Sequence, residues 1–123
     1  RYEQINHFEK LLADTGTTIL KFYLHISKEE QKERFEARLR DPNKNWKFSM
    51  EDVEKRELWD DYMRAFEDAL SRCSTPWAPW YVISANHKWY RNLVISQIIV
   101  DTLTKLDMRY PPPLEHADQI VIP

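Results

Sequence analysis

The chain has 123 residues, which is enough for one domain with a hydrophobic core, and its formal net charge of −2 provides no overall field to attract nucleic acid or a membrane. The single cysteine, Cys73, excludes an internal disulfide bond and any metal site built from several cysteines. The single glycine, Gly16, excludes a Walker A loop and a dinucleotide-binding fingerprint, because both motifs need more than one glycine. No apolar run reaches the roughly 18 residues of a membrane helix. We therefore expect a cytoplasmic protein that contacts neither membrane nor nucleic acid.

The first two elements in chain order are a helix and a strand. Residues 1–13 place their apolar side chains at helical spacing, and Gly16 stands where a left-handed residue ends a helix. Residues 17–25 are rich in β-branched and aromatic side chains, so they predict a strand that is covered on both faces. Lys21 is the polar exception. Its side chain either reaches solvent near the strand end or binds phosphate.

A second helix is predicted from Ser27 to about Arg40. Ser27 and Glu30 have the spacing of a capping box, and Asp41-Pro42 ends the helix because a proline restricts the residue before it. A loop is predicted to follow, as far as residue 48.

Basic residues gather on this helix and loop. Residues 28–47 contain seven Lys or Arg against five Asp or Glu. Arg34 and Arg38 are four apart, so they share a helical face, and Lys44 and Lys47 lie on the loop. This pattern suits a multiply charged oxyanion such as a phosphate chain, although a solvated charged face has the same pattern.

The second half repeats the alternation of helix and strand. Ser49 is a cap signal for a helix that runs to about Leu70, whose apolar stripe indicates packing. Residues 80–83 predict a short apolar strand, and residues 88–105 predict a helix with apolar residues on more than one side. Residues 107–123 contain three consecutive prolines and predict an irregular tail.

Strands that alternate with helices indicate an α/β fold with a parallel sheet. Two strands that are apolar on both faces cannot form a stable parallel sheet alone. The chain also begins without Met, inside a predicted helix. We therefore expect the C-terminal part of a larger domain whose other strands precede this chain.

The order and spacing of several short motifs resemble the polyphosphate kinase 2 family over residues 1 to about 110. The motifs are Tyr2-Glu-Gln-Ile-Asn6, Leu24-His-Ile-Ser-Lys-Glu-Glu-Gln31, Arg34-Phe-Glu-Ala-Arg38, Asp41-Pro-x-Lys44-x-Trp46-Lys47, Trp59-Asp-Asp-Tyr62, Thr75-x-x-Ala78-Pro-Trp-Tyr-Val82 and Lys88-Trp-Tyr-Arg91.

The resemblance implies the C-terminal portion of a P-loop kinase fold similar to thymidylate kinase, a three-layer sandwich with a parallel sheet. Residues 1–110 would form this portion, with a helical lid over about 28–70, and residues 111–123 would be the tail. The family's Walker A and Walker B elements precede such a segment, and this chain contains neither. The fragment alone is therefore expected to be inactive, and any Mg²⁺ ligands are expected in the missing N-terminal half.

The implied activity is reversible transfer of a terminal phosphoryl group between inorganic polyphosphate and a nucleoside mono- or diphosphate, such as AMP, ADP or the guanine equivalents. A homo-oligomer is also implied. By position in the motifs, the catalytic residue is Arg38, the polyphosphate-binding residues are Arg34, Lys44, Lys47 and Lys21, the nucleotide-binding residues are Asn86, Lys88 and Arg91, and no residue is a metal ligand.

Two alternatives stay open at this point. A module that binds polyphosphate or nucleotide without catalysis fits the missing Walker elements. A plain interaction domain would use its aromatic residues, Trp77, Trp80 and Trp89. In addition, Lys88 and Arg91 could simply lie at the surface of a helix N-terminus.

Overall fold

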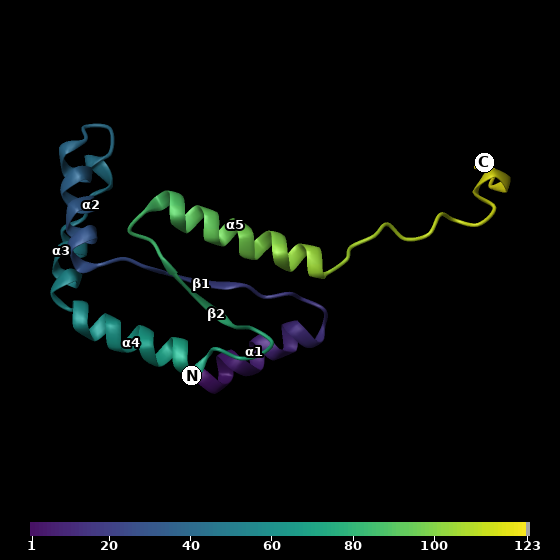
Figure 1. Ribbon diagram of the computed structural model, residues 1–123, viewed down its shortest axis with the longest axis horizontal. Helices are drawn as coiled ribbons and strands as arrows, with labels where there is room; N and C mark the ends of the chain where they lie inside the picture. The colour runs from purple at the N-terminus through teal and green to yellow at the C-terminus, as the bar shows by residue number, and fades with distance from the viewer. Residues whose placement is uncertain (123) are drawn as a thin grey trace.

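A computed structural model describes residues 1–122, in which helices alternate with two strands (Figure 1). The elements are α1 (Tyr2–Asp14), β1 (Lys21–His25), α2 (Lys28–Arg40), the 3₁₀ turn η1 (Asn45–Lys47), α3 (Met50–Glu57), α4 (Trp59–Arg72), β2 (Trp80–Ser84), α5 (Lys88–Lys105) and the 3₁₀ turn η2 (Ala117–Gln119). The helix predicted over residues 88–105 has those same bounds. The last residue of the expected tail, residue 123, lies outside the described part.

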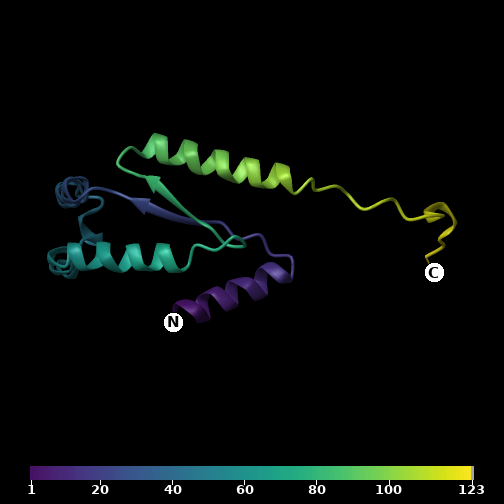
Figure 2. The ribbon, with the colours of Figure 1, turned by 60° about the horizontal axis from the view of Figure 1, so that its bottom comes forward.

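The two strands form a parallel pair, which confirms the α/β class. Lys21 is opposite Trp80 and His25 is opposite Ser84. Figure 2 shows α5 on one face of the pair and α1 and α4 on the other, so the chain has three layers. Apolar residues of β1 and β2 are needed on both faces because helices lie on both sides.

Strand β1 is shorter than the residues 17–25 that its composition predicts. A strand is held by hydrogen bonds to a neighbour, and β2 starts opposite Lys21. Residues 17–20 precede Lys21, so β2 offers them no partner for hydrogen bonds.

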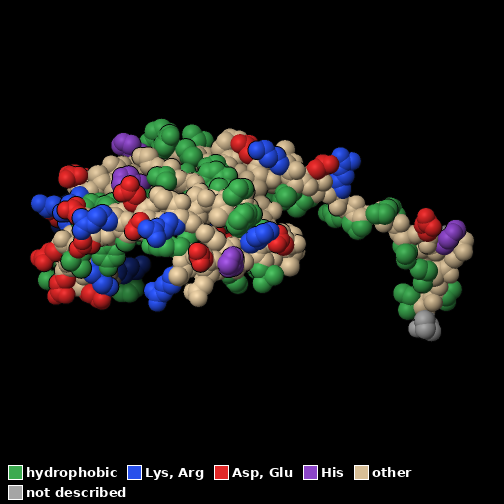
Figure 3. All heavy atoms as spheres, turned by 90° about the horizontal axis from the view of Figure 1, so that it is seen from below, with side chains coloured by type: hydrophobic (Ala, Val, Ile, Leu, Met, Phe, Trp, Pro, Cys, Tyr) green, Lys and Arg blue, Asp and Glu red, His purple; other side chains and the backbone are tan. Residues whose placement is uncertain are grey.

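Many large apolar side chains are exposed, including Phe8 at 61% and Leu11 at 61%, and green patches reach the surface of the body and the tail in Figure 3.

The helix predicted from Ser49 to about Leu70 is two helices. The chain turns at Leu58, whose φ of −87° and ψ of 20° interrupt the helical path between α3 and α4. Arg56 holds α3 against α2, because its Nη1 donates to the Lys28 carbonyl at 2.7 Å. The apolar stripe of α4 packs instead on the sheet, where the rings of Tyr23 and Phe66 are 5.0 Å apart. Two packing partners in different directions explain the break.

The predicted helix ends are partly confirmed. Gly16 has a φ of 92°, and the N–H groups of Gly16 and Thr17 donate to carbonyls in the last turn of α1, as a left-handed helix end requires. Ser27 Oγ accepts the Glu30 N–H at 3.1 Å, but the second half of the predicted capping box is wrong. The Ser27 N–H donates to Asn86 instead, because Arg34 occupies the Glu30 carboxylate.

None of the helices within residues 1–122 is both long enough and apolar enough to cross a lipid bilayer.

Candidate phosphate-binding site

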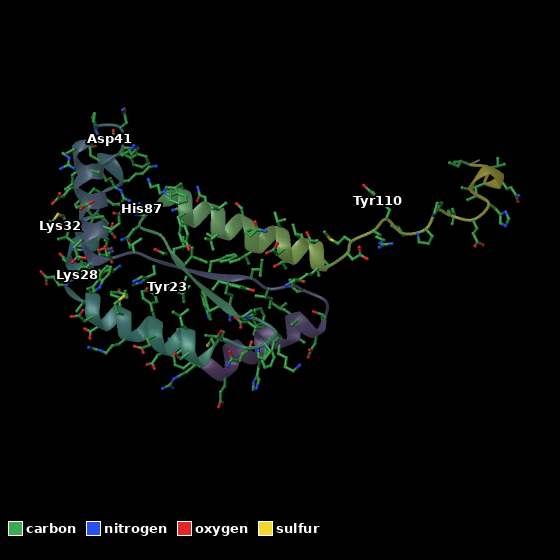
Figure 4. All side chains as sticks on the ribbon, viewed as in Figure 1. Tyr23, Lys28, Lys32, Asp41, His87 and Tyr110 are labelled. Atoms are coloured by element: carbon green, nitrogen blue, oxygen red, sulfur yellow. The ribbon has the colours of Figure 1, made fainter. Side chains whose placement is uncertain are left out.

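The candidate site lies where the two strands end. His25 and Ser84 finish β1 and β2 at the same edge, and the chain then enters α2 and α5. Figure 4 shows His87 at the start of α5, close to α2, with Asp41 at the far end of α2. In open α/β sheets, ligands bind beyond the carboxyl ends of parallel strands. The predicted basic residues of α2 and α5 therefore meet at the edge where a ligand is expected.

Hydrogen bonds fix α2 against the turn between β2 and α5. The Ser27 N–H donates to Asn86 Oδ1 at 3.0 Å. The guanidinium of Arg34 donates through Nη2 to the carbonyls of Ala85 at 2.7 Å and Asn86 at 3.1 Å. Its Nε donates to Glu30 at 2.7 Å. Arg34 and Asn86 thus join two segments that are more than 50 residues apart in the sequence, and they set the direction of α2.

A basic hollow of about 390 Å³ lies beside this junction. It is lined by Arg34, Ala37, Arg38, Lys44 and Lys88. Four of the eight predicted site residues, from α2, the following loop and α5, are therefore brought together. Within residues 1–122 no carboxylate lines this hollow. Four cationic side chains around one space provide the charge that a phosphate chain needs.

Arg38 is less engaged by the protein than Arg34 is. Its guanidinium lies 5.8 Å from the centre of the Phe35 ring, and the described residues give it no ion pair. The Phe35 ring meets Phe48 edge to face at 6.0 Å, which anchors the loop to the helix. Arg38 therefore lines the hollow with donors available for a ligand.

The loop after α2 is held by Asp41. Its Oδ1 accepts the Asn43 N–H at 3.0 Å and its Oδ2 pairs with Lys44 Nζ at 2.7 Å. The hydrogen bond from Lys44, followed by that from Asn43, lowers the pKa of Asp41, so its carboxylate stays charged at neutral pH. Lys47 lies on the same loop with its Nζ 4.9 Å from the centre of the Trp46 ring, and it is not part of the hollow's lining.

Lys21 lies at the opposite end of β1. Its Nζ pairs with Glu9 at 2.7 Å and donates to the Cys73 carbonyl at 2.7 Å. The side chains of Lys21 and Glu9 are only 11% and 13% exposed. The structure therefore separates Lys21 from the hollow. Arg91 also stays apart, with its guanidinium on Asn92 Oδ1 at 2.9 and 3.1 Å.

Comparison with known proteins shows what the chain is similar to. The model of the family described as polyphosphate kinase 2 (PPK2) matches residues 1–111. The chain belongs to the polyphosphate kinase 2 family. An AMP/ADP-polyphosphate phosphotransferase of Meiothermus ruber is 56% identical over 122 residues, covering 99% of this chain and 46% of that protein. An ADP-polyphosphate phosphotransferase of Rhodopseudomonas palustris is 49% identical over 111 residues, covering 90% of this chain and 38% of that protein.

A crystal structure from the same family has the same arrangement. The polyphosphate kinase 2 of Arthrobacter aurescens TC1 matches with a TM-score of 0.89 and 45% identity, over 96% of this chain and 43% of that chain. The chain thus spans less than half the length of these three relatives. The likeness confirms the α/β class of the PPK2 family, whose members are P-loop kinases.

Sequence reasoning missed the acceptors that hold the basic residues of this PPK2 chain. Asp41 for Lys44 and Glu30 for Arg34 could have been found from their spacing of three and four residues. The carbonyl of Ala85 gives no signal in the sequence, because every residue carries one.

Metal ligands do not gather in the described part of the chain. Among the side chains that the structure describes, no three His, Cys, Asp or Glu are grouped so that they could hold a metal ion. The hollow itself is lined by cations, which do not fit a Mg²⁺ site. No step involving the metal can be assigned to these side chains.

We expect Asn86→Ala to lower the free energy of unfolding of the full-length protein by about 1–2 kcal/mol, because the Ser27 N–H loses its acceptor. Asn86→Asp keeps an acceptor oxygen and is expected to retain most of that stability. Urea unfolding measures both. Full stability of Asn86→Ala with a raised KM for nucleotide would instead support the nucleotide-binding role implied by the resemblance.

Proposed function

We propose that this chain is part of an enzyme that transfers a terminal phosphoryl group reversibly between inorganic polyphosphate and a nucleoside mono- or diphosphate. The observation that carries the proposal is the basic hollow, in which Arg34, Arg38, Lys44 and Lys88 meet at the carboxyl ends of two parallel strands. Membership of the polyphosphate kinase 2 family supports the choice of polyphosphate among possible oxyanions. The chain spans less than half the length of the three relatives named above, so we assign the activity to a longer protein.

The chemistry of the hollow suits this reaction. Phosphoryl transfer needs little covalent catalysis, but it needs alignment and stabilisation of negative charge on the transferred group. Arg38 is proposed to supply that charge, because its guanidinium lines the hollow and no carboxylate engages it within the described residues. Arg34 already donates to two carbonyls and a carboxylate, so it contributes charge and holds α2 in place.

Residues 28–70 are proposed to act as a lid. This segment comprises α2, α3 and most of α4, and Arg56 ties its first two helices together. A lid that closes over both substrates would bring Arg38 to the transferred group only when they are bound, and it would exclude water from the donor. Lys44 and Lys47 on the loop would follow the polyphosphate chain as point charges.

The remaining parts of the proposal concern the nucleotide and the metal. Lys88 and Arg91, at the start of α5, would contact the nucleotide together with Asn86, whose side chain also holds Ser27. The acceptor would be AMP or ADP, or the guanine equivalents. Mg²⁺ would be held by residues outside this chain. We further propose a cytoplasmic homo-oligomer.

The test is ATP formation from polyphosphate and ADP with Mg²⁺, measured for the full-length protein, for this chain, and for this chain mixed with the remaining half. Activity of the full-length protein, absent from this chain and regained on mixing, is the expected result. An inactive full-length protein that retains polyphosphate on a filter would favour the second candidate, a binding module without catalysis. The absence of a glycine-rich phosphate loop from this chain favours that candidate for the chain alone.

Replacing both loop lysines, Lys44→Ala with Lys47→Ala, should raise the KM for polyphosphate by about tenfold at low ionic strength while kcat changes little, because two exposed charges are lost. The difference should shrink as salt is added. Asp41→Asn is the opposite control, since it keeps the oxygen that accepts the Asn43 N–H but removes the negative charge beside Lys44. It should lower the KM. An unchanged KM for the double variant at low salt would contradict the role of the loop.

A further inference from the structure

Two of the four cations that line the basic hollow are already paired with carboxylates of the same chain. Arg34 Nε lies 2.7 Å from Glu30 Oε1, and Lys44 Nζ lies 2.7 Å from Asp41 Oδ2. Glu30 and Asp41 themselves lie outside the lining of the hollow. Part of its positive charge is therefore matched before any ligand arrives, and a phosphate chain has to compete with these carboxylates.

The pair of Arg34 and Glu30 is fixed. Their side chains are 28% and 24% exposed, and Arg34 Nη2 also donates to the carbonyls of Ala85 and Asn86 at 2.7 and 3.1 Å. A phosphate that took the guanidinium away would leave two carbonyls and a carboxylate without their donor, and each loss costs free energy. We expect Arg34 to keep its present contacts when a ligand binds.

The pair of Lys44 and Asp41 is exchangeable. The Lys44 side chain is 66% exposed, and an exposed ion pair of this kind contributes little free energy. A lysine side chain is also flexible, and its ammonium group can turn its donors toward a new acceptor. Lys44 is therefore the carboxylate-paired cation of the hollow that can change its partner at little cost.

Asp41 cannot follow Lys44, because the backbone holds it. Its N–H donates to the Ala37 carbonyl at 3.2 Å, and its own carbonyl accepts the N–H groups of Lys44 and Asn45, both at 2.9 Å. Its Oδ1 accepts the Asn43 N–H at 3.0 Å. Figure 4 shows Asp41 at the end of α2, where the loop begins. An exchange of partners thus moves Lys44 Nζ and leaves the Asp41 carboxylate where it is.

The negative charge of Asp41 is not needed for the turn. A neutral asparagine at this position would also accept the Asn43 N–H. Asp41 directly follows the last residue of α2, where the negative end of the helix dipole disfavours an anion. Helix stability therefore does not explain the charge, and the charged group that the carboxylate contacts is Lys44.

The proposed reaction gives this pair a purpose, and the inference rests on that reaction. Reversible transfer requires the polymer to bind and to leave. Binding that is equally tight in the ground state and the transition state lowers KM without raising kcat. A carboxylate that takes Lys44 back would limit the affinity for polyphosphate, while Arg38 would stay available to the transferred group.

We propose that Asp41 is an internal competitor of polyphosphate, whose carboxylate holds Lys44 in the free protein and loses it to a phosphate group of the bound chain. When Arg38 and Lys88 hold neighbouring phosphate groups, the next group is at a high local concentration beside Lys44, which favours the exchange. Asp41 does not touch the substrate. It is a positioning residue that acts through Lys44.

The test is the binding of inorganic polyphosphate of one chain length to the full-length protein, measured by titration calorimetry at low ionic strength without nucleotide. Asp41→Asn removes the charge and keeps an acceptor for the Asn43 N–H. It should tighten binding about two- to fivefold, which corresponds to the weight of an exposed ion pair. Weaker binding would mean that Asp41 orients Lys44 toward the ligand, and it would overturn the proposal.

Two matched variants remove a negative charge from α2 without releasing Lys44. Glu36 lies 3.9 Å from Lys32 and from Arg40, which are both outside the lining of the hollow, so Glu36→Gln should leave the dissociation constant unchanged. Glu30→Gln should not tighten binding, because Arg34 stays on its carbonyls. Equal tightening by Glu36→Gln and Asp41→Asn would make the effect one of general electrostatics and contradict the proposal.

A double-mutant cycle tests whether Asp41 acts through Lys44. Asp41→Asn should have a much smaller effect on polyphosphate binding in a Lys44→Ala background than in the native protein, because the cation it competes for is absent. A gain of the same size in both backgrounds would show that the lost charge acts directly on the ligand. In that case the proposal is wrong.

These measurements separate this inference from the phosphotransferase proposal, because binding is measured without turnover. A protein that makes no ATP but binds polyphosphate with the expected pattern of variants would contradict the proposed reaction and leave the competition standing. An active protein whose affinity Asp41→Asn leaves unchanged would do the reverse. A full-length protein that binds no polyphosphate would overturn this inference.

Discussion

Arg38→Ala in the full-length protein is expected to lower kcat for ATP formation from polyphosphate and ADP by about 100-fold or more. The reason is the loss of a charge that acts on the transferred group in the transition state. The guanidinium lines the basic hollow, and its contact within the described residues is with the Phe35 ring rather than a carboxylate. Its removal should therefore leave the fold intact. Steady-state kinetics measure the loss of kcat, and the midpoint of urea unfolding measures whether the fold is intact.

Arg40→Ala is the matched control, because it removes the same charge from the same helix. Arg40 is 74% exposed, lies 3.9 Å from Glu36 and is not part of the hollow's lining. We expect its kcat to stay within about twofold of the native value, as for a surface ion pair of little energetic weight. Equal losses for the two variants would mean that general electrostatics, and not the position of Arg38, is responsible.

Lys21→Met is expected to destabilise the protein by about 3 kcal/mol, because it leaves the Glu9 carboxylate without its partner in a mostly buried position. The Cys73 carbonyl also loses a donor. Urea unfolding of the full-length protein measures the change. At temperatures where the variant is folded, its KM for polyphosphate should match that of the native protein, since Lys21 lies at the other end of β1 from the hollow.

Two further variants make this result specific. Lys10→Met removes an exposed pair with Asp14, whose side chains are 50% and 61% exposed, and should cost less than about 0.5 kcal/mol. Combining Lys21→Met with Glu9→Leu should recover much of the loss, because neither charge is then left unpaired. A stable Lys21→Met variant with a raised KM for polyphosphate would restore the phosphate-binding role that the family resemblance implies.

The amino-acid sequence by itself determined the local features and the family. The bounds of α5, the cap at Ser27 and the left-handed end at Gly16 follow from side chains close together in the chain, so their signals are local. The same holds for the basic character of α2 and its loop. The alternation of apolar strands and helices indicated a parallel sheet. Ordered motifs over residues 1 to about 110 indicated the polyphosphate kinase 2 family, which the family-model match over residues 1–111 confirms.

Only the tertiary structure decided which of these residues meet. Arg34 reaches the Ala85 carbonyl across 51 residues and Lys21 reaches the Cys73 carbonyl across 52, so neither partner is visible in a local pattern. The break at Leu58 arises because α3 packs on α2 while α4 packs on the sheet. The same physical reason applies to the contact of Arg34, the contact of Lys21 and the break at Leu58. Side-chain spacing fixes the period of an element, whereas its partners depend on how parallel strands bring distant segments to one edge.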